Sequence, residues 1–208
     1  VLTINIQILP PKVIDIQEYE VDSFIGGTSY DTGGRAGNYM QLHPTILGQN
    51  ANIWCKIQRA VPAPIQVTTA TPKEAIDIGP SGSRTVAFNT MVNAQPGLLG
   101  GVNTFHVYKL WSVQSGPGDN ELGITTRANG RVRIFLDTHN SDVLESHERA
   151  HGIDQLFIVN PTLDRHFNHS PGIPGDYQIP NNLMQSSNSG LNNRITARQA
   201  LILNSNIP

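Results

Sequence analysis

The chain has 208 residues and a formal net charge of −2, and charged residues make up only 14% of it, against about 25% in typical globular domains. The sequence has no cluster of basic residues, so we expect no nucleic-acid-binding surface. It also has no apolar run close to the roughly 20 residues of a membrane span, so we expect no transmembrane segment. Scarce lysine and abundant asparagine, glycine and threonine indicate a secreted protein or a protein of a virion or cell surface.

The first part of the chain, residues 1–137, is predicted to be rich in β-strands. Apolar and polar residues alternate there in short segments separated by glycine- and proline-rich turns, which is the pattern of half-buried strands. These segments cover residues 1–9, 12–24, 51–58, 63–71, 83–94, 103–114 and 130–138. Their close spacing predicts an antiparallel sandwich or a barrel-like fold.

The second part, residues 138–208, begins with a predicted helix. Asn140 or Ser141 can cap it, and Asp142 suits its first turn. The helix either continues past Gly152 or stops there and is followed by a strand at 153–159. A long polar loop and a closing helix or strand at 191–203 complete a mainly β, α+β chain. The two parts are separate regions or form one domain over residues 1–208.

The predicted helix contains the motif H-E-x-x-H, from His147 to His151. Residues i and i+4 of a helix lie on the same face, so both imidazoles can reach one Zn²⁺ at about 2.0–2.1 Å. Glu148 can then take a proton from the metal-bound water as a general base. The sequence therefore predicts a zinc site with His147 and His151 as ligands and Glu148 as the catalytic residue.

Over residues 131–155, the order of strand, turn and motif helix resembles the zincin metallopeptidases. In that family an edge strand holds the peptide substrate and the next helix presents the motif. The resemblance implies zinc-dependent hydrolysis of peptide bonds in a peptide or protein substrate. Asp154 and Phe157 stand where the metzincin branch has glycine and histidine, and no glutamate follows Glu148 to act as in the gluzincin branch.

The third zinc ligand is therefore left to an aspartate or a histidine. We prefer His166, because imidazole is the commoner partner in such sites. His169, Asp164, Asp176 and Asp154 remain alternatives.

Under the alternative interpretation, the motif is accidental. Glu145 and Glu148 then solvate a surface helix, and Glu145 and Arg149 form an i,i+4 ion pair. The chain would be a non-catalytic β-sandwich, such as a capsid, appendage or adhesion subunit, that acts by self-assembly into homo-oligomers. A carbohydrate-binding sandwich is a third possibility. In every case we expect Cys55 to be a core thiol and Trp54 a core side chain.

Overall fold

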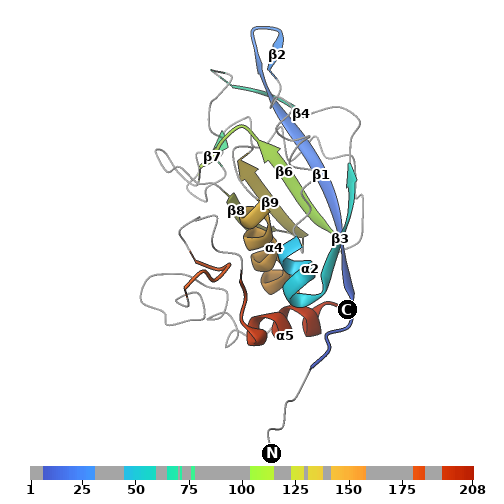
Figure 1. Cartoon of the computed structure of the whole chain (residues 1–208). Coiled ribbons are helices and arrows are strands. Elements are labelled where there is room, and N and C mark those ends of the chain that lie inside the picture. Colours follow the sequence, from blue (N-terminus) through green and yellow to red (C-terminus); the bar gives the residue numbers. More distant parts are fainter. Residues whose placement is uncertain are drawn as a thin grey trace, which may run out of the picture.

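The computed structural model describes residues 7–30, 45–59, 65–69, 71, 76–77, 104–114, 123–128, 131–137, 142–157, 180–185 and 194–208. These residues form one seven-stranded sheet, one two-stranded sheet and three helices (Figure 1). The large sheet contains β1 (Lys12–Ile25), β2 (Thr28–Tyr30), β3 (Ile53–Arg59), β4 (Ile65–Thr68), β6 (Phe105–Leu110), β8 (Gly123–Ala128) and β9 (Arg131–Asp137). The small sheet contains β5 (Ile76–Asp77) and β7 (Val113–Gln114), and the helices are α2 (Thr45–Ala51), α4 (Asp142–Phe157) and α5 (Ala197–Asn206).

The long strand β1 is the centre of the large sheet. It pairs in parallel with β3, β4 and β6, and β6 in turn pairs in parallel with β9. Only β2 and β8 run antiparallel to their neighbours, β1 and β9. The prediction of a mainly β, α+β chain is confirmed. The antiparallel sandwich or barrel is not confirmed, because alternation of apolar residues does not distinguish parallel from antiparallel pairing.

Helices α2 and α4 pack against one face of this sheet, and α5 packs against these two helices (Figure 1). Apolar side chains from α2, α4 and α5 share one core cluster with residues of β1, β6 and β9, among them Ile16, Phe105, Val132, Leu144 and Leu203. No described helix is long and apolar enough to cross a membrane. The division of the chain at residue 137 stays a prediction, since nothing in the described residues tests it.

Gly152 lies inside α4, which continues to Phe157, so the predicted strand at 153–159 is wrong where it overlaps the helix. A Cβ atom on Gly152 would lie 2.8 Å from Cε2 of Phe105 and 3.0 Å from Cγ1 of Val132. The glycine therefore allows the helix to approach the sheet closely. This packing outweighs the low intrinsic helix propensity of glycine.

The C-terminal helix α5 starts with a capping box, in which Thr196 and Gln199 satisfy each other's backbone N–H groups. Further along α5, the side-chain amide of Asn204 donates to the carbonyl oxygens of Pro10 at 2.7 Å and Ala51 at 2.8 Å. The predicted closing element is therefore a helix, and it holds together the start of β1 and the end of α2.

The opposite face of the sheet carries a row of stacked rings. Tyr19 of β1, Tyr108 of β6 and Phe135 of β9 are neighbours in register, with centroids 4.7 Å and 5.1 Å apart. The imidazole of His106 stacks beside Tyr19 and is 1% exposed. Burial is the main reason that the pKa of His106 is lowered from 6.5 to about 4, and the positive charges of Arg131 and Arg133 lower it further.

We expect the free energy of unfolding to fall as the pH is lowered from 6.5 to about 4. In this range folded His106 stays neutral while the unfolded imidazole takes up a proton, so the unfolded state binds more protons and is favoured. Urea unfolding measured at several pH values checks this. The variant His106→Gln should show a shallower pH dependence over the same range, and an unchanged slope would contradict the role of His106.

Candidate functional site

Helix α4 turns the side chains of the motif toward different surroundings. His147 faces the segment 180–185, which precedes α5, and His151 faces His147. Glu148 faces the strand β8. Arg149 faces the strands β1 and β3. Within two turns of one helix, the side chains of the motif therefore contact three different parts of the protein.

The two histidines face each other. Their Nε2 atoms are 3.1 Å apart, and their rings form an edge-on pair with centroids 4.7 Å apart. Nδ1 of His147 lies 2.6 Å from the carbonyl oxygen of Leu183. Because a carbonyl can only accept, Nδ1 carries the proton and Nε2 of His147 presents its lone pair toward His151. His147 is buried, and this burial lowers its pKa.

The Leu183 carbonyl is held in place by the segment around it. The N–H of Leu183 donates to the carbonyl oxygen of Arg194 at 2.6 Å. Asn182 accepts from the backbone of Met184 and donates to Gln199 at 2.8 Å. Since Gln199 also caps α5, the start of that helix sets the orientation of His147.

The spacing of the two Nε2 atoms fits two kinds of interaction. Two ligand atoms bound at about 2.0–2.1 Å to a tetrahedral metal ion are about 3.3 Å apart, close to the 3.1 Å seen here. A single N–H···N hydrogen bond between neutral imidazoles fits as well. The donor set of two imidazole nitrogens suits a divalent transition-metal ion such as Zn²⁺.

The carboxylate of Glu148 is held against β8. It accepts a hydrogen bond from the hydroxyl of Thr125 at 2.6 Å, and its side chain is 5% exposed. A Cβ atom on Gly123 would lie 2.9 Å from Cγ of Glu148 and 3.1 Å from its Oε1. Glycine at this position thus leaves room for the carboxylate beside the strand.

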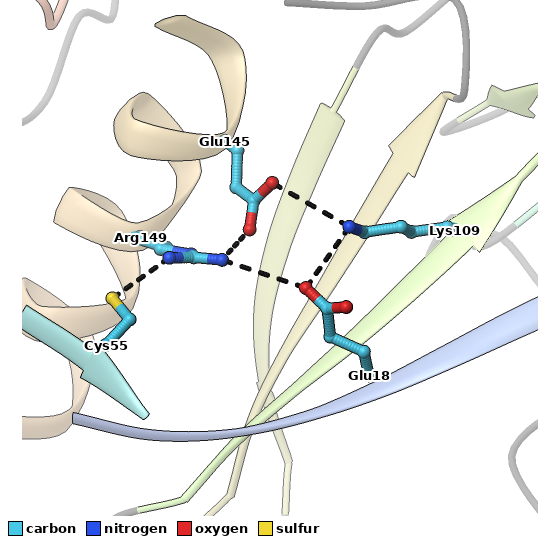
Figure 2. A network of polar contacts seen from close by, with 5 residues as sticks. All are labelled: Glu18, Cys55, Lys109, Glu145 and Arg149. Carbon is cyan, nitrogen blue, oxygen red and sulfur yellow. Dashed lines mark hydrogen bonds and ion pairs between the residues drawn. The ribbon is translucent and has the colours of Figure 1, made fainter. Parts of the chain in front are cut away.

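On the sheet side of α4, four charged side chains form a buried network (Figure 2). Nζ of Lys109 lies 3.1 Å from Oε1 of Glu18 and 4.0 Å from Oε2 of Glu145. Arg149 contacts Glu145 and lies 4.0 Å from the same oxygen of Glu18. All four side chains are at most 3% exposed. The predicted Glu145–Arg149 pair therefore forms, but its expected place on the surface is wrong.

This network shows how α4 is oriented on the sheet. Glu145 and Arg149 come from the helix, whereas Glu18 and Lys109 come from β1 and β6 (Figure 2). Burial lowers the pKa of Lys109 to about 8, although the charge of Glu18 opposes this shift. A rotation of the helix would leave buried charges unpaired, at a high cost in free energy. The network thus stabilises the orientation of α4 about its own axis in which the two histidines point away from the sheet.

Cys55 is linked to the same network. Nη1 of Arg149 donates to its sulfur at 2.9 Å (Figure 2). The thiol packs against the core as predicted, but it is half-buried and not fully buried. The neighbouring Trp54 is 53% exposed, so its predicted place in the core is wrong. The two side chains follow each other in β3, and consecutive residues of a strand point to opposite faces.

The candidates for a third zinc ligand are not brought to the histidines by the described structure. Asp154 is half-buried in α4. His166, His169, Asp164 and Asp176 lie outside the described residues, so His166 stays a prediction. Within the described part of the chain, no three histidine, cysteine, aspartate or glutamate side chains are grouped so that they could hold a metal ion.

No protein-family model matches the sequence, and no curated protein is significantly similar to it. The resemblance to the zincins is wrong for two physical reasons. The three-ligand metal group that it implies is not present among the described residues. The strand before the motif helix, β9, is paired on both sides by β6 and β8, so it is not an edge strand that can hold a substrate.

Proposed function

We propose that the protein is a metal-dependent hydrolase in which His147 and His151 bind one divalent transition-metal ion. The observation that carries this proposal is the pair of facing Nε2 atoms, 3.1 Å apart, with the other ring nitrogen of His147 bound to a backbone carbonyl. Metal-binding histidines usually donate their second N–H in this way, which fixes the tautomer and the ring orientation. His166 remains the proposed third protein ligand.

In this proposal Glu148 is the general base. A bound metal ion would supply a water of lowered pKa as the nucleophile. Glu148 follows His147 directly, and its carboxylate is already fixed by the hydroxyl of Thr125. A base held in one orientation loses little entropy when it takes the proton.

Peptide bonds are the proposed substrate class. Strand β8, which carries Thr125, pairs only with β9 among the described residues. The other edge of such a strand suits an extended peptide, which would add by backbone hydrogen bonds. Because Glu148 contacts Thr125 of this strand, a peptide added to β8 would lie on the side of the helix that carries the proposed base.

Metal content tests this proposal directly. We expect the purified chain, supplied with zinc and dialysed, to retain about one zinc ion per chain in elemental mass spectrometry. His147→Ala should lose the ion, because it removes one of only two proposed ligands in α4. The matched control His43→Ala, which changes a histidine outside the motif, should keep it. An unmodified chain without metal after this treatment would contradict the proposal.

A second candidate function is self-assembly as a structural subunit. Trp54 is 53% exposed and Val13 is 59% exposed, and the two are cross-strand neighbours on β3 and β1. Among the described residues β3 pairs only with β1, so its other edge could pair with a second copy. Light scattering on the same preparation separates the candidates: a metal-free chain whose molar mass grows with concentration would favour assembly. A secreted or surface location agrees with both.

A further inference from the structure

The sheet face opposite α4 has a polar cluster at the end of its row of rings. The rings of Tyr19 and Tyr108 are inclined by only 12° with centroids 4.7 Å apart, and the hydroxyl of Tyr108 interacts with the side chain of Arg133. The hydroxyl of Tyr19 lies 3.0 Å from Nδ1 of His106. His106 is the register neighbour of Arg133 on β9. Strand pairing thus brings two hydroxyls, an imidazole and a guanidinium together.

Nε2 of His106 is buried without a hydrogen-bond partner in the described structure. The hydroxyl of Tyr108 interacts with the side chain of Arg133, and neither this oxygen nor Nε of Arg133 has a further partner there. A buried polar group without a partner costs about 1–3 kcal/mol. Such groups are rare in native proteins, and an unseen water or ion commonly explains them. The position of His106 Nε2 beside the Tyr108–Arg133 pair on one sheet face indicates a missing partner that all three share.

The missing partner can be identified by its chemistry. A tyrosine hydroxyl is a better donor than an acceptor toward a neutral imidazole, so Tyr19 donates to Nδ1 and the proton of His106 is on Nε2. Arg133 can only donate to the hydroxyl of Tyr108, so the O–H of Tyr108 and the remaining N–H groups of Arg133 are further donors. The cluster therefore offers three donors to a group that can only accept.

The charge around the cluster favours a negative partner. The charged groups that shift the pKa of His106 are Arg131 and Arg133, and both are positive. Neither arginine forms an ion pair with an acidic side chain among the described residues. Burial raises the pKa of Tyr19 and Tyr108, and the two arginines oppose this shift. Both tyrosines therefore keep their protons at neutral pH and act as donors.

We propose that His106, Tyr108 and Arg133, with Tyr19 as the residue that orients His106, form a binding site for a small oxyanion of the phosphate or carboxylate type. Planar and tetrahedral oxyanions accept several charge-assisted hydrogen bonds at once, and arginine is suited to give them. The cluster lies on the opposite face of the sheet from His147 and His151, so the site is independent of the proposed hydrolase function.

Isothermal titration calorimetry of the full chain with inorganic phosphate, and separately with acetate, tests this proposal at constant ionic strength. We expect saturable binding of at least one of the two anions, and the tighter one identifies the type of oxyanion. Arg133→Gln should weaken that binding about 10- to 100-fold, as the loss of one charge-assisted hydrogen bond predicts. The control Arg127→Gln, an exposed arginine on β8, should bind like the unmodified chain.

Two outcomes overturn the proposal. One is that neither anion gives saturable binding to the unmodified chain. The other is that Arg133→Gln and Arg127→Gln weaken binding equally, because the effect is then only that of net charge. If Arg133→Gln does not fold, Tyr108→Phe replaces it, since this variant removes one donor and keeps the stacked ring. Unchanged affinity in Tyr108→Phe would likewise contradict the site.

Discussion

Replacing Arg149 by methionine is expected to lower the free energy of unfolding by about 3–5 kcal/mol. The arginine is fully buried and contacts Glu145, with Glu18 nearby. Methionine fills a similar volume but leaves two buried carboxylates with Lys109 as their only cation in the network. Urea unfolding followed by circular dichroism measures the loss.

Two further variants show whether this loss comes from the buried charge. Arg198→Met makes the same substitution at an exposed position of α5 and should change stability by about 0.5 kcal/mol or less. The double variant Glu145→Gln with Arg149→Met removes one carboxylate as well and should recover part of the stability. If Arg149→Met lowers the free energy of unfolding no more than Arg198→Met does, the network does not stabilise the fold.

Glu148→Gln is expected to lower peptide hydrolysis by the metal-loaded chain about 10²- to 10⁴-fold. The amide oxygen can still accept from Thr125, so the side chain keeps its place, but it no longer takes a proton. Cleavage of a fluorogenic peptide library gives the rate, and elemental mass spectrometry should find the metal content unchanged.

The matched control for this variant is Thr125→Val, which removes the hydroxyl and keeps the carboxylate. It should cost less activity than Glu148→Gln, because the base is still present but less well oriented. Equal rates for Glu148→Gln and the unmodified chain would mean that another group accepts the proton. Loss of metal in Glu148→Gln would mean that Glu148 acts on the ion and not on the water.

Local patterns in the sequence predict several elements of the fold well. The strands β1, β3, β6 and β9 follow from alternation, and the start of α4 follows from the acidic first turn. The strand β8 and the helix α2 were not predicted, since each is short and carries little periodic signal. The parallel order of the sheet also could not be predicted, because it depends on pairs far apart in the chain.

The candidate site was predictable only where its contacts are local. The spacing of His147 and His151 on a helix correctly predicts that they face each other. Leu183 lies 36 positions after His147 in the sequence, so no local pattern predicts the hydrogen bond between them. The same holds for the burial of Arg149, since Glu18 and Lys109 come from strands distant in sequence. Charged residues in a helix predict exposure, but here Glu145 and Arg149 form an ion pair in the interior.

The central place of β1 has a consequence for how the chain folds during synthesis. One edge of β1 pairs with β6, and the contact between Tyr19 and His106 joins residues 87 positions apart. At a synthesis rate of about 5–20 residues per second, that edge waits roughly 4–17 s for its partner. Contacts between distant strands also fold slowly because the loop must close first. During this interval the edge of β1 that later pairs with β6 stays open, and β3 cannot cover it because β3 pairs with the opposite edge. An unpaired edge of this kind is a site at which nascent chains can aggregate.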